Sequence, residues 1–339
     1  MIFKNKQGIG PLLLLFGTFL FACQSSEETP LQSLRIAFGS CNRTDLPQVM
    51  WEPINKNMPD VFVWLGDIVY GDTHDMTDLE AKYKKVKNEP GYISLSNHAE
   101  IIGVWDDHDY GWNDSGKNYG KKDSSQQLLL DFLDISDESP LRQQEGVYSS
   151  HVFGKHPVMT KIILLDARFF RDTVIADPDP ARRYTVNETG DVLGEQQWRW
   201  LEKELRSTEA DVHIIGSGIQ VIPTEHGWEK WANFPRSRQR LFDLIRSIKP
   251  KNTLMISGDR HIAEFSKIEL GEKVELYEAT SSGLTHTWNN IWEEPNQHRV
   301  KDMVIKKNFG IIEITPQEIN VEIRGEMDSL YNKIRIPQQ

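Results

Sequence analysis

The chain has 339 residues, of which 38% are hydrophobic, 26% are charged and 10% are aromatic. This is an ordinary globular composition, with enough residues for one large core or two small ones. The formal net charge of -11 excludes a protein that holds nucleic acid or anionic lipid through a broad basic surface. We therefore expect no sequence-specific binding of nucleic acid, and we expect a monomer.

The N-terminus has the pattern of an export signal. Two lysines precede an almost wholly apolar run, PLLLLFGTFLFA, at residues 11–22. This run has the length of a signal-peptide core and is short for a membrane span. The junction LFAC at residues 20–23 looks like a bacterial lipobox, which predicts lipidation of Cys23. The alternative is a plain cleaved signal with an incidental cysteine.

These patterns divide the chain into a lipoprotein signal peptide at residues 1–22, a flexible tether at residues 23–33 and one catalytic domain at residues 34–339. We expect an exported protein anchored to a membrane, in the periplasm or on the cell surface. Gln24 after the lipidated cysteine favours the outer membrane where one exists. Lipidation of Cys23 leaves Cys41 unpaired in an oxidising compartment. Cys41 then has a functional use, is an inert buried thiol, or forms a disulfide with an unlipidated Cys23.

From residue 34 onward, short apolar runs end abruptly at Gly, Ser, Asp or His. The runs are RIAF, VFVWL, IIGVW, IILL, HII, TLMI and VELYEAT, and polar or amphipathic segments follow them. Helices are predicted over residues 77–87, 125–133, 195–206 and 237–248. This alternation is typical of an α/β protein. Near the end, residues 310–314 and 319–323 predict a hairpin.

Asp, His, Cys and Arg side chains follow six of these runs. In open α/β sheets, ligands bind beyond the carboxyl ends of the strands, so these side chains are candidates for one shared site. The densest segment is VWDDHDYGWND at residues 104–114. Buried carboxylates in such number require cations or water, and three nearby residues that prefer burial (Val104, Trp105 and Trp112) argue against the alternative of an exposed acidic turn.

Two further segments place carboxylates at strand ends. Asp67 follows Gly66, which allows the backbone to turn close to an ion. Asp259 and His261 follow the run TLMI, and in an extended chain two residues this far apart point to the same side. Arg260 should then face away from the site.

In order, the motifs GSC, GDxxY, DDHD and GDxH resemble those of the PhoD-like (alkaline phosphatase D) family of calcineurin-like metallophosphoesterases. The resemblance covers most of residues 34–315. Asp106 and Asp107 stand where the wider superfamily has Gly-Asn, and Asp259 stands where it has a histidine; both agree with the PhoD-like branch.

The resemblance implies an αββα sandwich, in which two packed mixed β-sheets are flanked by helices, with a di- or trinuclear site. The implied metals are Fe³⁺ and Ca²⁺, with other divalent metals as alternatives. A thiolate and a phenolate suit ferric iron, and carboxylates suit calcium. The implied metal ligands are Cys41, Asp67, Tyr70, Asp107, Asp259 and His261. Tyr70 has the alternative role of a packed core tyrosine.

His108 is the candidate catalytic acid, held by Asp109 or a neighbouring acid; the alternative is a core histidine bonded to backbone. Arg168 is the candidate phosphate clamp, or else neutralises Asp106. Weaker candidates for lining the site are Gln220, Asn113 and His286.

The expected function is hydrolysis of phosphate esters by a metal-activated water, with diesters favoured over monoesters. One alternative is an alkaline phosphomonoesterase that scavenges phosphate. Another is a metal-stabilised surface lipoprotein without turnover. The tryptophan-rich stretches at residues 228–234 and 288–292 form a substrate rim or pack in the core or a lid.

Overall fold

The computed structural model describes residues 1–2, 33–155, 158–207, 209–271, 273–288, 290 and 294–338. The predicted signal peptide, the lipidation site Cys23 and the tether up to residue 32 lie outside these residues, apart from residues 1–2. Within the described part of the chain, no helix is long and apolar enough to cross a membrane. The described part of Gln32–Gln339 forms one compact unit, and its assignment as one catalytic domain stays a prediction.

Two mixed sheets form the centre of this unit. The first has six strands, in the order β15 (Leu330–Pro337), β14 (Glu318–Arg324), β13 (Phe309–Ile314), β1 (Leu34–Gly39), β2 (Val61–Leu65) and β3 (Glu100–Val104). The second has seven, in the order β12 (Arg299–Val304), β10 (Ala263–Glu269), β11 (Glu275–Ser281), β9 (Thr253–Ser257), β8 (Val212–Ser217), β5 (Val158–Leu165) and β4 (Ser149–Lys155). A separate short hairpin pairs β6 (Ile175–Ala176) with β7 (Tyr184–Thr185).

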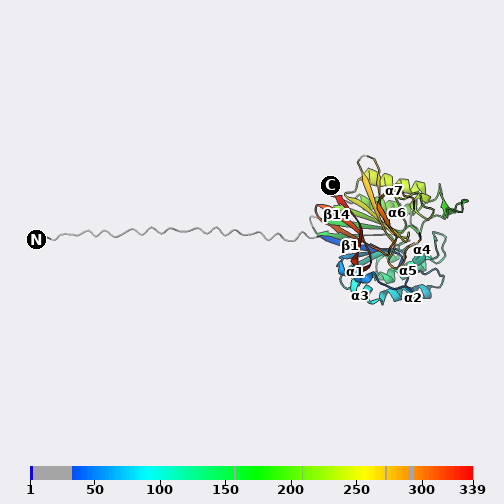
Figure 1. The fold of residues 1–339 in the computed structure, drawn as a ribbon, viewed down its shortest axis with the longest axis horizontal. Helices are drawn as coiled ribbons and strands as arrows, with labels where there is room; N and C mark the ends of the chain where they lie inside the picture. Colours follow the sequence, from blue (N-terminus) through cyan, green and yellow to red (C-terminus); the bar gives the residue numbers. More distant parts are fainter. Residues whose placement is uncertain are drawn as a thin grey trace. The chain divides into compact units, whose positions relative to one another are not determined.

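Helices cover the outer faces of both sheets (Figure 1). The α-helices are α1 (Trp51–Lys56), α2 (Met76–Lys87), α3 (Pro90–Ser96), α4 (Asp107–Tyr110), α5 (Lys122–Phe132), α6 (Gly194–Leu205) and α7 (Pro235–Ile248). The short 3-10 helices are η1 (Pro140–Arg142), η2 (Trp231–Asn233) and η3 (Glu326–Asp328). In Figure 1, α6 and α7 lie on one side of the sheets, and α1, α2, α3 and α5 lie on the other.

Strand β5 shows how the sequence builds these layers. Because successive side chains of a strand point to opposite faces, Ile162 and Leu164 pack in the core between the sheets, whereas Ile163 and Leu165 pack beneath α6 and α7. All four are completely buried, as expected for a strand covered on both faces. The predicted αββα sandwich is confirmed.

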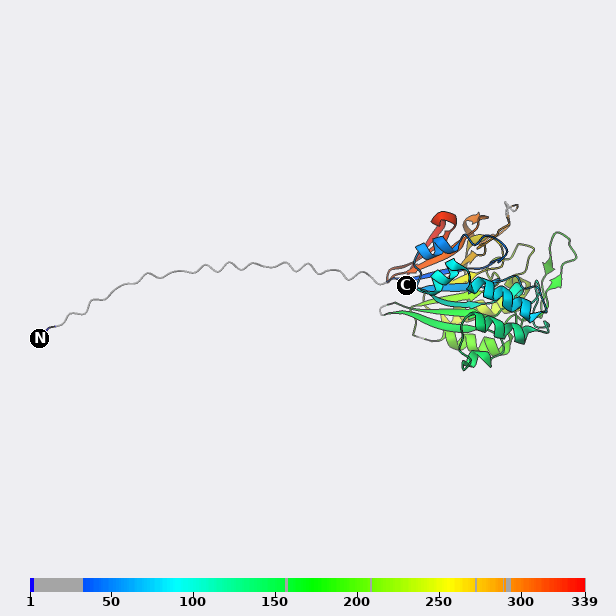
Figure 2. The same cartoon turned by 90° about the horizontal axis from the view of Figure 1, so that it is seen from below.

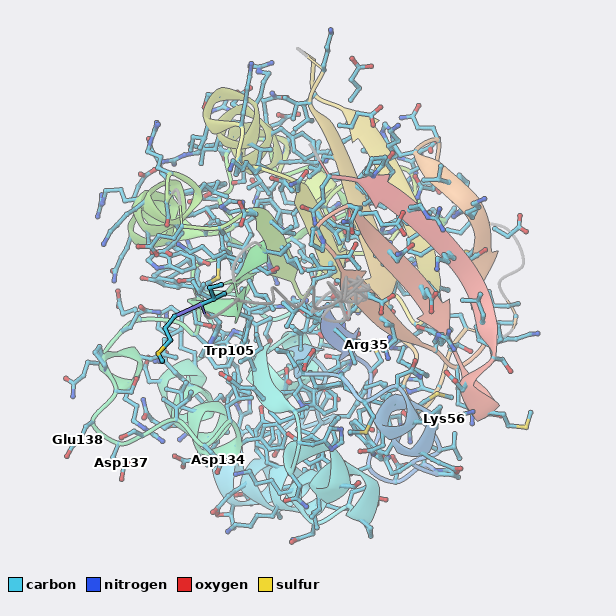
Figure 3. The ribbon with its side chains drawn as sticks, turned by 90° about the vertical axis from the view of Figure 1, so that its left-hand side faces the viewer. Arg35, Lys56, Trp105, Asp134, Asp137 and Glu138 are labelled. Atoms are coloured by element: carbon cyan, nitrogen blue, oxygen red, sulfur yellow. The ribbon has the colours of Figure 1, made fainter. Side chains whose placement is uncertain are left out.

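The parallel strands of both sheets direct their carboxyl ends to the site. Strands β1, β2 and β3 are parallel neighbours in the first sheet, and β5, β8, β9 and β11 are parallel neighbours in the second. The segments that follow these strands carry the sequence motifs. By contrast, three acids after α5, namely Asp134, Asp137 and Glu138, lie at the edge of the molecule, away from its centre (Figure 3).

Candidate metal centre

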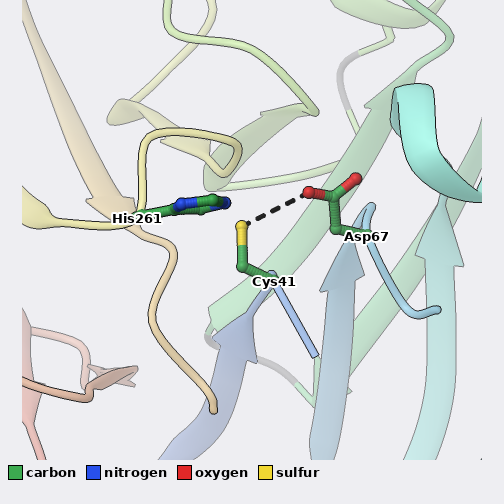
Figure 4. A group of neighbouring side chains, drawn as sticks. All are labelled: Cys41, Asp67 and His261. Carbon is green, nitrogen blue, oxygen red and sulfur yellow. Dashed lines mark hydrogen bonds between the residues drawn. The ribbon is translucent and has the colours of Figure 1, made fainter. Parts of the chain in front are cut away.

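Cys41, Asp67 and His261 meet at the ends of three strands (Figure 4). Cys41 follows β1, Asp67 follows β2 and His261 follows β9. Their ligand atoms lie within 4.8 Å of one another, and Cys41 Sγ is 3.5 Å from Asp67 Oδ2. Cys41 is a buried free thiol in the described part of the chain. The two sheets therefore bring together three of the predicted ligands.

The backbone at four predicted ligands is left-handed. The φ angles are 61° at Cys41, 50° at Asp67, 66° at Asp259 and 53° at His261. The prediction that Asp259 and His261 share an extended segment is thus wrong, because both lie in the turn between β9 and β10. Non-glycine residues adopt this conformation at a cost, and such strain concentrates at functional sites.

A glycine permits the close approach of this turn to the rest of the site. A Cβ atom on Gly258 would lie 2.5 Å from the Leu65 carbonyl oxygen and 2.6 Å from Ser40 Oγ. The end of β9 consequently packs directly against the ends of β1 and β2. This contact across the two sheets is what places Asp259 and His261 beside Cys41 and Asp67.

Tyr70 points its hydroxyl group into the same cluster. Its oxygen is 2.9 Å from His261 Nε2 and 3.2 Å from His286 Nε2. The Tyr70 ring also stacks near His108, with 4.1 Å between the ring centroids. These polar contacts place the phenol among the candidate ligands and differ from those of a tyrosine packed only in the core.

Asp107 lies at the centre of the buried acids. Its carboxylate is within 4.8 Å of ligand atoms in three groups: Asp67 with His108, Asp106 with Asp259, and Asp114 with Glu229. Asp106, Asp107 and Asp109 are all buried, so the segment is not an exposed acidic turn. Trp112, which we expected to be buried, is 45% exposed.

These carboxyl groups disturb one another's ionisation. Burial, together with Asp107, raises the pKa of Asp259 to about 7. Burial also raises the pKa of Asp67 well above its ordinary value, with Asp107, Asp109 and Asp259 adding to the effect. The Cys41 thiol has a raised pKa for the same reasons, burial first and then Asp67. Without cations, the site therefore retains protons that a metal would displace.

His108 is oriented by Asp72. Its Nδ1 atom lies 2.8 Å from both carboxylate oxygens of Asp72. Although burial lowers the pKa of His108, the carboxylates of Asp107, Asp67 and Asp72 raise it to about 11. Asp109, the predicted partner, instead accepts backbone hydrogen bonds from Ile68 and Asp106. The residue that holds His108 is thus the neighbouring acid Asp72, and the side chain is not a core histidine bonded only to backbone.

Arg168 is completely buried among carboxylates. Its Nε donates to Asp106 Oδ1 at 2.7 Å, and its Nη1 donates to Glu229 Oε2 at 2.7 Å. Glu229 also pairs with Arg171, at 2.9 Å. This is the arrangement expected from the alternative role of Arg168, neutralisation of Asp106. The role of phosphate clamp stays a prediction that the contacts do not favour.

The weaker candidates have different positions. Gln220 is buried and donates to Glu264 and Thr280, both at 2.8 Å, so it links the strands behind the site. Asn113 is exposed at the mouth of a small cavity beside Asp107. His286 contacts Tyr70 and His261, with 4.4 Å between the two imidazole centroids.

The described tryptophans of the two aromatic stretches pack together. Trp228 stacks on Trp288 with 5.5 Å between centroids, and Trp288 packs on His261 at 5.1 Å. Trp231 is completely buried. Trp228 and Trp288 support the His261 turn and also line the small cavity, as the substrate-rim alternative expects, whereas Trp231 packs on Trp198 in the core.

The donor set fits the metals that the resemblance implies. Asp67 Oδ1 and Asp106 Oδ2 are buried, and neither has a hydrogen-bond partner among the described residues. A buried carboxylate oxygen without a partner is costly, and a cation would satisfy it. Thiol, phenol and imidazole groups on one side of Asp67 suit a transition metal, and the carboxylates around Asp107 suit a hard cation.

Fold and site together define an αββα protein of the calcineurin-like kind with a candidate metal centre. Residues 36–307 match the PhoD-like phosphatase family, and the chain belongs to this family. It is 22% identical over 292 residues to alkaline phosphatase D of Bacillus subtilis (strain 168). The match covers 74% of this chain and 49% of the relative, so the chain spans about half the relative's length.

Two solved structures share the fold. The structure of PhoD matches with a TM-score of 0.73 and 16% identity, over 90% of this chain and 68% of that one. GAP50, described as the anchor in the inner membrane complex of Plasmodium, matches with a TM-score of 0.61 and 13% identity, over 91% of this chain and 89% of that one. At these identities the likeness establishes the fold alone.

Proposed function

We propose that this protein is an exported, metal-dependent phosphate ester hydrolase, with phosphodiesters as the favoured substrates. The observation that carries the proposal is the cluster of predicted ligands, in which Asp67 keeps an unpartnered carboxylate oxygen; the adjacent Asp106, which was not a predicted ligand, keeps another. An oriented histidine, His108, stands beside this cluster. Membership in the PhoD-like phosphatase family supports the same chemistry.

Each part of the site has a role in this hydrolysis. Cys41, Tyr70 and His261 would hold a ferric ion, and Asp107 and Asp259 would hold calcium; Asp67 belongs to one candidate ligand group with Cys41 and to another with Asp107. Bound metals would supply a water activated near neutral pH and positive charge for the phosphoryl oxygens. His108, fixed by Asp72, donates a proton to the leaving alkoxide. Arg168 donates a hydrogen bond to Asp106 and holds this carboxyl group in place.

The cavities have room for a phosphoryl group and one substituent of a phosphate ester. A small cavity of about 50 Å³ touches Asp107, His108 and Asp259. A larger one of about 630 Å³ touches Tyr70 and His286, and both cavities touch His261 and Trp288. A phosphoryl group in the small cavity leaves room in the larger one for one alcohol substituent, which monoesters and diesters both carry, so the preference for diesters rests on the family resemblance.

Export and lipid anchoring rest on the sequence before residue 33. We propose that Cys23 becomes the lipidated first residue of the mature protein. Mass spectrometry of the protein from its native membrane would find the N-terminal peptide heavier by the mass of a diacylglyceryl or triacylated cysteine. An unmodified N-terminal peptide would contradict the anchor and leave the hydrolase proposal intact.

The hydrolase proposal is tested with purified residues 24–339. Metal content and the visible spectrum are measured, and hydrolysis of bis-p-nitrophenyl phosphate is compared with that of p-nitrophenyl phosphate. We expect bound iron with a visible charge-transfer band, and faster turnover of the diester. Asp67→Ala and His108→Ala should each abolish turnover, whereas Asp137→Asn, at a side chain that is 97% exposed, should not.

If the protein hydrolyses neither ester after iron and calcium are added, the proposal that it is an enzyme is contradicted. It would favour the metal-stabilised surface lipoprotein without turnover.

A further inference from the structure

Two positively charged side chains line the small cavity beside the metal centre. Its lining includes the predicted ligands Asp107, Asp259 and His261, together with Arg183 and Arg260. Its volume of about 50 Å³ is enough for a few water molecules, and so for the oxygens of a tetrahedral oxyanion. A phosphate group entering it would meet acids as well as metals, so a cation free to reach its oxygens would assist binding.

Arg183 is the better placed of these two cations. Arg260 is buried and pairs with Glu294 at 2.5 Å. Arg168, deeper in the molecule, has no exposed surface and contacts Asp106 and Glu229. The side chain of Arg183 is 43% exposed and lines the same cavity. It therefore has the freedom to contact a substrate that the two buried arginines lack.

Arg183 lies in the β6–β7 hairpin, whose backbone contacts hold the residue beside the small cavity. Figure 2 shows the hairpin projecting from one end of the molecule. The backbone N–H groups of Arg183 and Tyr184 both donate to the carbonyl oxygen of Gly227, at 3.0 and 3.3 Å. The Arg183 guanidinium lies 5.8 Å from the centroid of the Trp228 ring. Backbone anchoring thus fixes the base of the residue and leaves its side chain adjustable.

Asp114, the acid that pairs with Arg183, has other hydrogen-bond donors as well. Arg183 Nη2 lies 2.8 Å from Asp114 Oδ2, and the guanidinium side chain is 43% exposed whereas the carboxylate side chain is 10% exposed. The same carboxylate accepts hydrogen bonds from Tyr184 Oη and Asn113 Nδ2, both at 2.5 Å. Arg183 can turn toward a ligand without leaving Asp114 unpartnered.

We propose that Arg183 is a substrate-binding residue that donates hydrogen bonds to a non-bridging oxygen of the phosphoryl group. The inference rests on the proposed phosphoesterase function, since it assigns a ligand to the same cavity. Guanidinium groups present paired donors that match phosphate oxygens. Arg183 would then serve as the clamp that the sequence assigned to Arg168.

The test measures binding of inorganic phosphate to the metal-loaded protein by calorimetry, beside KM and kcat for the two p-nitrophenyl esters. Loss of a charge-assisted hydrogen bond in Arg183→Gln should weaken phosphate binding ~10- to 100-fold. Arg183→Lys should give an intermediate loss. KM should rise for both esters, because they share the phosphoryl group. Arg182→Gln, the neighbouring exposed arginine of the hairpin, is the control and should bind phosphate as the wild type does.

Metal content and melting temperature are measured for every variant, so that a damaged centre is recognised. Phosphate affinity within twofold of wild type in Arg183→Gln would overturn the inference. So would wild-type protein that binds no phosphate, or a KM effect confined to one ester. Wild-type protein that hydrolyses neither ester, yet binds phosphate through Arg183, would contradict the proposed activity and support the inference.

Discussion

Asp67 is the residue at which burial, charge and backbone conformation conflict most. It is completely buried, its φ is 50°, and Oδ1 has no partner in the described part of the chain. Burial raises its pKa well above the ordinary value. Such a residue destabilises the metal-free fold, and metal binding would offset the cost.

Asp67→Asn should therefore change stability in opposite directions with and without metal. A raised pKa means that the metal-free fold loses stability as pH rises above the unfolded pKa of the carboxyl group. Asparagine removes this loss, so the variant should gain about 1–3 kcal/mol at pH 8 with chelator present, and less at pH 5. With iron and calcium, it should be less stable than wild type. Thermal unfolding at both pH values measures the difference.

Asp137→Asn is the matched control, since this aspartate is exposed and remote from the centre (Figure 3). It should leave both melting temperatures unchanged. An Asp67→Asn variant that melts below wild type in chelator at pH 8 would contradict the idea that Asp67 opposes folding of the metal-free chain.

Asp72 acts through His108. Asp72→Asn should lower kcat about 10- to 100-fold, the usual effect of losing a residue that orients a functional side chain. Asp72 helps to raise the pKa of His108, so its loss should move the alkaline limb of the kcat profile to lower pH. The control is Asp78→Asn, an exposed acid paired with Lys82 on α2. An unshifted profile would indicate that Asp72 does not hold the catalytic acid.

Among the elements, α6 follows its sequence pattern closely. The helix predicted over residues 195–206 forms, and its apolar residues Trp198, Leu201 and Leu205 are all buried. Their spacing of three and four residues puts them on one face of the helix, over the second sheet. The helices and the hairpin could be predicted from the sequence, because their patterns of apolar residues depend on residues that are close together in the chain.

Leu201→Ala should destabilise the fold by about 2–5 kcal/mol, because it leaves a cavity beneath α6. Lys203→Ala, on the exposed face of the same helix, should stay within about 0.5 kcal/mol of wild type. Chemical denaturation with metals held constant gives both values. Equal effects at the two positions would mean that α6 does not pack as described.

The predicted runs and hairpin do not include strands β4, β6, β7, β10, β12 and β15. The runs that end at motifs stand out because they are buried and strongly apolar, whereas β12 is largely exposed or half-buried. Its place at the edge of the second sheet depends on pairing with β10. Strand order likewise depends on contacts between distant segments, which local periodicity does not encode.

The site was predictable where its residues lie in strand-end motifs. The predicted ligands Cys41, Asp67 and His261 converge because parallel strands end at one edge. Glu229 was missed because it lies in a long connection without a periodic pattern, and only the fold brings it to Arg168. Asp72 lies two residues after the motif GDxxY, but its partner His108 is 36 residues away.

For the whole molecule, metal binding should be coupled to release of protons. Asp259 has a pKa of about 7, and Asp67 and Cys41 have raised pKa values in the metal-free chain. Metal must displace these protons, so its affinity should fall as pH drops below 7. Calorimetry of calcium and iron uptake in buffers of different ionisation enthalpy counts the protons. Uptake that releases none at pH 6 would contradict the ionisation of this centre.

The junction between the two sheets has a consequence for the order of folding. Cys41 and Asp67 belong to strand ends of the first sheet, while Asp259 and His261 belong to the second. A nascent chain has no complete donor set until residues near 260 are synthesised and the sheets have docked. The visible charge-transfer band of bound iron should therefore appear only in the slowest kinetic phase of refolding. Its appearance would show that the two sheets have reached their native arrangement.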